Sequence, residues 1–564
     1  MASACSSSSS SPSSCNSSCE KQASAREAYQ KLAQYLKESS HLEGINGLVS
    51  WDTAVLLPKH ASDIRGKQSA ALAGVLHERH TSNELKDLLC AIEEHPNKED
   101  ELNEWERAVL REARRSFDKA VRVPKELAKQ EAELESRGYT QWVKAREQKD
   151  FSLFAPVLKE WIELRKKLCK HVDPEKPPYD VCIDRFEPGM TTARYEVIFE
   201  EVKAGLIGLL QQILQKQKES PDEFIFDHSF VVNPGYDVAT QTELGKSVAL
   251  DLGFDTDRGR MDVSVHPFTG GTHPTDVRIT TRYSDNLIEG IMGTIHEVGH
   301  ALYEQGRNKE YEDLPVTEAQ SMGIHESQSL FYERMVGQHR NFWKHYWPKV
   351  QQMFGDKVTG LKDRSVEDFY RALNLVTPSL IRVDADEVTY SLHIVLRFEI
   401  ERGLLDGSIS VDELPEIWNK KMQQYLGVKP PHDSLGVLQD VHWSSGLFGY
   451  FPSYSLGAMY ACQFFSRVKE DIPDLEERIE RGEFAEVKSW LNTHIHCKGK
   501  LYSSSDELCK AVTGQPLAPK FFLDHLQQKY ADLCDHTMVM AEMDFQSIHS
   551  RLAVKTVIQH ITSH

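Results

Sequence analysis

The sequence predicts a mainly α-helical globular protein with a small β-ribbon or sheet in front of one central helix. Apolar residues recur at helical spacing almost without a break from residue 23 to 218. Alternating apolar and polar residues, which indicate strands, are concentrated between Asp257 and Tyr283. With 564 residues and 40% hydrophobic side chains, the chain can bury a large core.

The first half of the chain is expected to form stacked helices. Long, charged, amphipathic segments such as residues 101–120 and 152–172 are typical of helices that present one face to a core. The segment WDTAVLLP at 51–58 combines an aromatic residue, an acid and a proline, which favours packing at a helix end. A proline-containing break at 174–190 is predicted to connect two helical blocks.

Composition excludes several classes of partner and indicates a cytoplasmic protein. The chain has 66 basic and 85 acidic residues, and its net charge of −19 argues against nucleic-acid or anionic membrane surfaces. No run of 18 apolar residues exists that would span a bilayer. Ten cysteines are scattered without paired spacing or a C-x-x-C motif, which is typical of reduced intracellular thiols.

The N-terminal tract of Ser and Cys lacks an apolar core, so we do not expect a secretory signal. A disordered cytosolic extension is one interpretation of this tract. The alternative is a plastid or other organelle import sequence, because no acidic residue precedes Glu20, although arginine is absent as well.

A helix is predicted across the middle of the chain. Ser284-Asp285 offers an N-cap, apolar residues follow at helical spacing, and Gly306 is a suitable end. The motif His-Glu-Val-Gly-His lies within this helix at 296–300. Its two histidines are four residues apart, so they project from the same face, one turn above the other.

This spacing allows both imidazoles, His296 and His300, to bind one metal ion. Glu297 follows the first histidine, where its carboxylate can accept a proton from water that attacks an amide. The alternative is an ordinary buried helix that happens to carry two histidines.

A third metal ligand is expected on a following helix, which a capping-box pattern at 317–320 is predicted to start. Glu326 is the most natural candidate, and a His-His-Glu set with an open fourth position is the catalytic zinc arrangement. Two rivals remain: Glu304, one turn past His300, and His325, which neighbours Glu326.

Two strands, at 261–268 and 276–283, are predicted to flank a turn at 269–272 and to lead into the metal helix. Such a ribbon can offer its backbone edge to an extended peptide. The alternative is a small sheet that only braces the helix.

Arg382 stands among three acids, Asp384, Asp386 and Glu387. A buried guanidinium held by these carboxylates can bind a substrate carboxylate through two parallel hydrogen bonds; the alternative is a structural salt-bridge network. Segments 436–443 and 449–457, rich in glycine and aromatic residues, are predicted to be irregular and to line a site, where a tyrosine can donate to an oxyanion.

The order of the motifs resembles the carboxypeptidase Taq family of metallocarboxypeptidases. The resemblance rests on HPF (266–268), DVRIT (276–280), HEVGH (296–300), HESQ (325–328), IRVDAD (381–386) and GVLQDVHW (436–443). Weaker similarity extends it over roughly 25–533. The organisation it implies is an extension at 1–24, a catalytic domain at 25–535 and a C-terminal extension at 536–564.

The resemblance implies a saddle-like helical fold with a deep groove, a homodimer, and release of single C-terminal residues from peptides with broad specificity. The cofactor it implies is Zn²⁺, for which Co²⁺ is a possible substitute because His and carboxylate ligands accept both. The residues carried over are His296, His300 and Glu326 as metal ligands, Glu297 as general acid/base, Arg382 for the substrate carboxylate, and His266, Asp276, Arg278, His442 and Tyr454 as groove residues.

One residue departs from the family pattern, since Asp384 stands where a glutamate is common. Two other functions stay open on the sequence. One is an oligopeptidase that cuts internal bonds with the same metal site, and the other is a binding protein that keeps the groove without activity.

Overall fold

The computed structural model describes residues 24–219, 229–264 and 266–534. The predicted extensions at 1–24 and 536–564 therefore lie outside the described residues, apart from Ser24. Among the described helices, none is both long enough and apolar enough to cross a membrane.

The first half is helical, as predicted, and several helix starts have clear local causes. Ser24 and Glu27 form a capping box at the start of the first helix, and Asn103 and Glu106 do the same for the fifth. The helices are α1 (Ala25–Val55), α2 (Ser62–His80), α3 (Asn83–Glu93), α4 (Lys98–Glu101), α5 (Glu104–Arg122), α6 (Lys125–Gln148), α7 (Ala155–Val172), α8 (Pro178–Ile183) and α9 (Thr192–Glu219).

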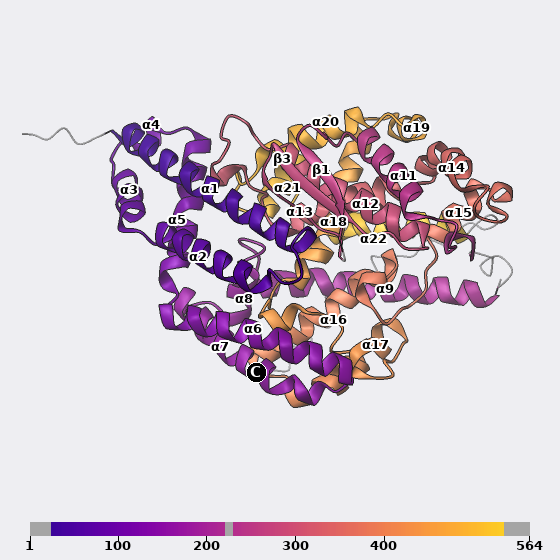
Figure 1. Cartoon of the computed structure of the whole chain (residues 1–564), viewed down its shortest axis with the longest axis horizontal. Coiled ribbons are helices and arrows are strands. Elements are labelled where there is room, and N and C mark those ends of the chain that lie inside the picture. Colours follow the sequence, from indigo (N-terminus) through magenta and orange to yellow (C-terminus); the bar gives the residue numbers. More distant parts are fainter. Residues whose placement is uncertain (1–23, 220–228, 265, 535–564) are drawn as a thin grey trace, which may run out of the picture.

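The second half contains the sheet and the remaining helices (Figure 1). Before the metal helix come α11 (Val238–Asp251), β1 (Gly259–Val263), β2 (Thr269–His273) and β3 (Asp276–Thr281). The helices that follow are α12 (Leu287–Gln305), α13 (Met322–Leu330), α14 (Arg340–Phe354), α15 (Val366–Leu373), α16 (Glu387–Asp406), α17 (Leu414–Leu426), α18 (Phe451–Asp471), α19 (Leu475–Arg481), α20 (Ala485–His494), α21 (Ser505–Thr513) and α22 (Pro519–Cys534).

The prediction of a mainly helical protein with a small sheet beside the central helix is confirmed, but the strand pattern differs. The sheet has three strands in the order β1-β3-β2, with β1 parallel and β2 antiparallel to β3. The predicted turn at 269–272 is wrong, because these residues form β2. The Gly-Gly pair suggested a turn, whereas Gly271 sits at a bulge with φ 144°, where an added Cβ would lie 2.3 Å from the carbonyl oxygen of Asp276.

Helix α1 packs against the edge strand β2. A Cβ on Gly44 or Gly47 would come within 2.7 and 2.4 Å of the carbonyl oxygens of Thr272 and Gly271, so only glycine allows this approach. Near its C-terminal end, α1 buries Trp51, whose ring packs against Phe268. The expected role of WDTAVLLP in packing at a helix end is thus confirmed.

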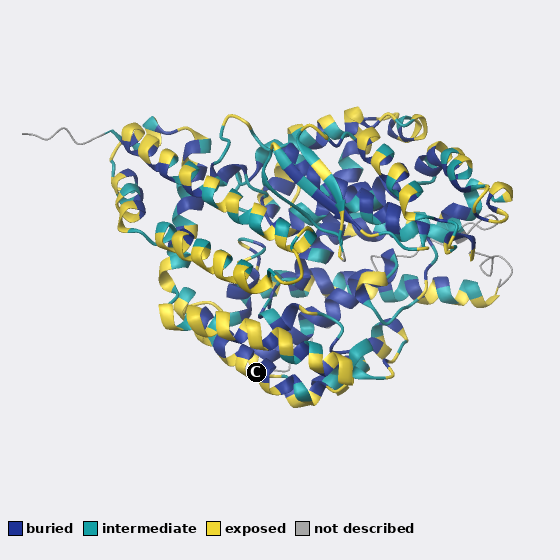
Figure 2. Ribbon diagram, viewed as in Figure 1, coloured by how far each residue is buried: buried dark blue, intermediate teal, exposed yellow. Residues whose placement is uncertain are grey.

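Two hydrophobic cores hold the described residues together. A small core joins α1, α3 and α5 through residues such as Leu32, Leu89 and Val109. The large core contains the buried faces of α12, α13, α16 and α18. Figure 2 shows this burial at the centre of the molecule, while the outer faces of α1 and α2 are exposed. The central helices are therefore a rigid support for functional side chains.

Three predicted boundaries near the site are shifted. The N-cap of α12 is Asn286, because the Ser284 hydroxyl is directed to Glu289 instead. Helix α13 begins at Met322 with Ser321 as its N-cap, since Pro315–Thr317 forms a separate 3₁₀ turn. The segment expected to be irregular up to residue 457 is helical from the start of α18.

Candidate metal centre

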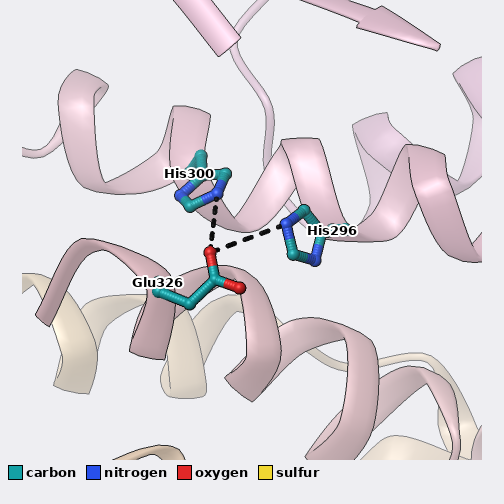
Figure 3. A group of neighbouring side chains, drawn as sticks. All are labelled: His296, His300 and Glu326. Carbon is teal, nitrogen blue, oxygen red and sulfur yellow. Dashed lines mark ion pairs between the residues drawn. The ribbon is translucent and has the colours of Figure 1, made fainter. Parts of the chain in front are cut away.

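Two neighbouring helices bring together the three predicted metal ligands. His296 and His300 project from α12, and Glu326 projects toward them from α13 (Figure 3). The Oε2 atom of Glu326 lies 3.9 Å from Nε2 of His296 and 3.5 Å from Nε2 of His300. Gly299 makes this approach possible, since a Cβ there would lie 2.5 Å from the carbonyl oxygen of Gln328 on α13.

Each histidine is oriented by a partner on its other ring nitrogen. Nδ1 of His296 lies 2.7 Å from Oε2 of Glu333, in the π-helical turn Phe331–Gly337. Nδ1 of His300 lies 2.6 Å from Nδ1 of His325. These contacts leave both Nε2 atoms facing Glu326, which is how metal-binding imidazoles are fixed in proteins.

The two rival ligands occupy this outer layer. His325 contacts His300 through Nδ1, and its Nε2 lies 2.9 Å from Oε1 of Glu304. Glu304 therefore reaches His300 only through His325. Neither rival belongs to the inner group of ligand atoms.

The electrostatics of the centre favour a bound cation. Burial alone would lower the pKa of His296, but the hydrogen bond to Glu333 and the charge of Glu326 raise it to about 10. Burial raises the pKa of Glu326, yet the two histidines bring it down to about 2. Burial and the neighbouring His325 lower the pKa of His300. The carboxylates thus outweigh the histidines in charge.

The donor set fits a catalytic divalent metal. The ligand atoms of His296, His300 and Glu326 all lie within 4.8 Å of one another, and they are the only group of three or more possible ligands that gather this way in the described part of the chain. Two imidazole nitrogens and one carboxylate oxygen leave an open coordination position for a metal such as zinc. A closed structural site would need a fourth protein ligand.

Glu297 is held beside this group by the edge strand. Its side chain is buried on α12, and its Oε2 accepts a hydrogen bond of 2.6 Å from Oγ1 of Thr269 on β2. The same hydroxyl lies 3.1 Å from the backbone oxygen of Glu297. The sheet therefore orients the predicted base as well as bracing the helix.

Arg382 is buried, as expected, but its predicted partners are wrong. Asp384 is exposed, Asp386 caps α16, and Glu387 pairs with Lys529 at 2.6 Å. The partner of Arg382 is instead Asp440, with 3.1 Å between Nε and Oδ1. Asp386 and Glu387 therefore cap and anchor α16 instead of holding Arg382. Having aspartate where the family commonly has glutamate, at position 384, does not change the contacts of the guanidinium.

A second arginine, Arg397 on α16, shares the same carboxylate. Its Nε lies 2.7 Å from Oδ2 of Asp440, and its Nη2 donates to Oε1 of Gln439 at 2.8 Å. Arg397 is fully buried and Arg382 is 6% exposed. We call Arg382, Arg397 and Asp440 the arginine cluster; two cations share one anion, so it carries an excess positive charge.

His442 and Tyr454, two of the predicted groove residues, lie against this cluster, and their binding role stays a prediction. The guanidinium of Arg382 lies 4.7 Å above the Tyr454 ring, and Nε2 of His442 lies 3.3 Å from the Tyr454 hydroxyl. Burial lowers the pKa of His442 to about 4. His442 is therefore neutral at pH 7 and adds no charge to the cluster.

The remaining three predicted groove residues lie on or beside the sheet. Asp276 and Arg278 bind each other through two hydrogen bonds of 2.8 Å, and Arg278 faces the Trp51 ring. His266 is exposed between β1 and β2. Among the described residues, no hydrogen bond or ion pair joins these side chains to the metal ligands or to Glu297, so their binding role stays a prediction.

Sequence reasoning missed four supporting residues: Glu333, Thr269, Arg397 and Asp440. Glu333 follows Glu326 by seven residues, about two helical turns, and that spacing was a usable signal. Asp440 lies in a quoted motif without an assigned partner. Arg397 offered no local signal, because only the packing of α16 brings it to Asp440.

A cavity of about 620 Å³ lies next to His325 and Glu304, the two residues behind His300. It is bounded by α1, α5 and β2, and Glu304 and His325 line it, whereas the three metal ligands do not. The edge strand β2 thus separates α1 from the metal helix, and its residues Thr269 to His273 are open to this space.

Comparison with known proteins agrees with the geometry. The family model for the carboxypeptidase Taq (M32) metallopeptidases matches residues 31–530. Thermostable carboxypeptidase 1 of Thermus thermophilus is 40% identical over 517 residues, covering 90% of this chain and 99% of that protein. Carboxypeptidase 1 of Bacillus subtilis is 38% identical over 499 residues, covering 88% and 97%.

Solved structures agree as well. The M32 carboxypeptidase from Deinococcus radiodurans R1 matches with a TM-score of 0.85 and 33% identity, covering 90% of this chain and 99% of that one. Metallocarboxypeptidase 1 of Trypanosoma cruzi gives a TM-score of 0.84 and 36% identity, with 89% and 99% covered.

Proposed function

The chain belongs to the carboxypeptidase Taq (M32) family and is a metallocarboxypeptidase, and from this premise we propose that it is zinc-dependent and removes single C-terminal residues from peptides with broad specificity. The observation that carries this proposal is the arginine cluster beside the metal centre. A buried excess positive charge is costly unless an anion joins it, and a peptide's α-carboxylate is such an anion.

Zinc, when bound by His296, His300 and Glu326, supplies a Lewis acid that polarises the scissile carbonyl and lowers the pKa of water. Glu297 accepts the proton of the attacking water and passes it to the leaving amine. The hydrogen bond from Thr269 keeps the Glu297 carboxylate in place during this exchange.

The substrate is positioned from its C-terminal end. Arg382, fixed by Asp440 and stacked on Tyr454, binds the α-carboxylate. The Tyr454 hydroxyl or neutral His442 donates a hydrogen bond to the oxyanion that develops at the scissile carbonyl. An internal peptide bond offers no carboxylate here and leaves the excess charge of the cluster uncompensated.

The test compares an N-acylated dipeptide with its C-terminal amide. Wild-type protein loaded with zinc should hydrolyse the free acid much faster than the amide, and metal analysis should find about one zinc per chain, as three protein ligands imply. Arg382→Ala should abolish the preference for the acid. Arg402→Ala, which removes a half-exposed arginine of α16 that pairs with Glu196, is the matched control.

Two results would contradict the proposal. Equal cleavage of acid and amide by the wild type favours the alternative, an oligopeptidase that cuts internal bonds. An unchanged preference for the acid in Arg382→Ala would show that this arginine does not bind the carboxylate.

A further inference from the structure

A second cavity, of about 390 Å³, lies among α5, α6, α7 and α8 and shares no residue with the metal centre or the arginine cluster. We call it the basic cavity. In a chain with a net charge of −19, its lining contains more cations than acids. The cations are Arg115, Lys119, Arg122, Arg165, Lys176 and Arg185.

The four acids of the lining are already engaged. Asp184, for example, lies 2.8 Å from Lys119 and 3.8 Å from Arg115, so one carboxylate serves two cations. Arg185 takes part in no ion pair in the described part of the chain, and its guanidinium lies 5.5 Å from the centre of the Phe186 ring. Arg185 is therefore a cation exposed to the cavity without a carboxylate partner.

Arg165 adds a buried charge to the same wall. Its side chain is 5% exposed, and Nη2 donates to Oε1 of Glu131 at 2.7 Å. Its Nε is buried and has no hydrogen-bond partner. The charge of this buried guanidinium is weakly screened by water, so an anion in the cavity would be attracted to it.

The two arginines also repel each other. Although the residue keeps exposed surface, desolvation of its guanidinium by the surrounding protein and the charge of Arg165 lower the pKa of Arg185 below its ordinary value. A bound anion would relieve this repulsion. Leu168, Val172 and Val181 line the cavity with apolar surface, so the wall is a mixture of arginine and aliphatic groups.

We propose that the basic cavity binds a small, multiply charged oxyanion that carries phosphate or carboxylate groups, with Arg185 and Arg165 as its principal contacts. Guanidinium groups bind both oxyanions through paired hydrogen bonds. The volume fits a small metabolite rather than a polymer. This site is additional to peptide hydrolysis and does not depend on the proposed substrate.

Isothermal titration calorimetry of the zinc-loaded protein tests the proposal with two separate probes, inorganic phosphate and succinate, at ionic strength balanced with sodium chloride. Arg185→Gln should weaken binding of the preferred probe about tenfold or more, as expected for the loss of a charged hydrogen-bond donor. Arg185→Lys keeps the charge, so its affinity should lie between those of the wild type and Arg185→Gln. Arg185 is exposed, so these variants should fold, and their peptidase activity should stay unchanged.

Arg137→Gln is the matched control, because it removes one exposed arginine that pairs with Glu160 outside the cavity. Either probe can also bind at the metal or at Arg382, but that binding would be the same in Arg185→Gln. Only the part of the measured binding that is lost in Arg185→Gln and kept in Arg137→Gln belongs to the basic cavity.

The outcomes are decisive in each direction. Stronger binding of phosphate identifies a phosphoryl ligand, and stronger binding of succinate identifies a dicarboxylate. Absence of binding by both probes, or equal affinity in wild type and Arg185→Gln, would overturn the proposal.

Discussion

The metal centre and the arginine cluster are both buried and charged, but their charges have opposite signs. Glu326 and Glu333 surround His296 and raise its pKa to about 10, so the centre favours a cation. Arg382 and Arg397 share a single carboxylate, so the cluster favours an anion. In the proposed function, the scissile carbonyl of a peptide would lie at the first region and its terminal carboxylate at the second, so the difference in charge would set the direction in which the peptide binds.

One helix links the two regions. Gly457 of α18 packs against Glu326, where an added Cβ would lie 2.5 Å from Cγ of the glutamate. Three residues earlier, Tyr454 on the same helix lies under Arg382. Helix α18 therefore contacts both the metal ligand Glu326 and the guanidinium of Arg382, which itself lies in the short 3₁₀ turn Arg382–Asp384.

The largest expected effect is at the metal side. Glu297→Gln removes the proton acceptor without removing a metal ligand, so kcat should fall by about 10²- to 10⁴-fold. Zinc content, measured by atomic absorption, should stay at the wild-type level. Near-normal turnover with full zinc would show that another group is the base.

The next effect tests the charge of the cluster. Although burial raises the pKa of Asp440, Arg397 and Arg382 hold it well below its ordinary value, so the carboxylate is ionised. Asp440→Asn leaves two buried guanidiniums without their anion and should lower the free energy of unfolding by about 3–5 kcal/mol. Urea denaturation measures this loss.

The matched control for this effect is Asp412→Asn. Asp412 pairs with Lys159 on the surface, with 70% of its side chain exposed, so the change should cost less than about 1 kcal/mol. Similar losses for both variants would contradict the description of the cluster as an excess of buried positive charge.

The same contrast explains how much the sequence could predict. The metal centre was predictable because His296 and His300 are four residues apart on one helix, with Glu297 between them. Glu326 lies on the next α-helix of the chain. Local spacing carries that information. Thr269 was missed because its glycine neighbours suggested a turn, whereas the structure places it on an edge strand.

The arginine cluster was only partly predictable. Burial of Arg382 was expected, but three nearby acids in the sequence obscured its true partner, which lies 58 residues away. Arg397 joins only through the packing of α16 against that segment. Tertiary pairing of charges depends on which chain segments meet, and one sequence offers no spacing rule for this.

A smaller effect comes from Glu187, a buried carboxyl that contacts helix α13 of the metal centre. It accepts a hydrogen bond from the Gly323 amide at the start of α13, and another of 3.3 Å from the Ser505 hydroxyl at the start of α21. Burial, opposed by these hydrogen bonds, raises its pKa from 4.5 to about 7. The folded protein thus holds a proton that the unfolded chain releases near pH 4.5.

Because the folded pKa is raised, the stabilising effect of protonated Glu187 is complete below about pH 4.5 and is lost as the pH rises through about 7. Glu187→Gln is neutral at every pH. The stability of the wild type relative to this variant should therefore fall by up to about 3 kcal/mol between these limits. A difference in urea stability that does not change with pH would show that the pKa of Glu187 is the same in the folded and the unfolded protein.

The smallest effect concerns the outer layer of the metal centre. Glu333 accepts a hydrogen bond from Nδ1 of His296, so Glu333→Gln keeps an acceptor but removes a negative charge. Zinc affinity, measured by competition with a chromophoric chelator, should weaken about 10- to 100-fold. Glu367→Gln, which removes a carboxylate paired with Arg340 away from the centre, should leave affinity unchanged. If both variants bind zinc as tightly as the wild type, the three inner ligands alone set the affinity. The negative charge of Glu333 would then contribute nothing to the preference of the metal centre for a cation.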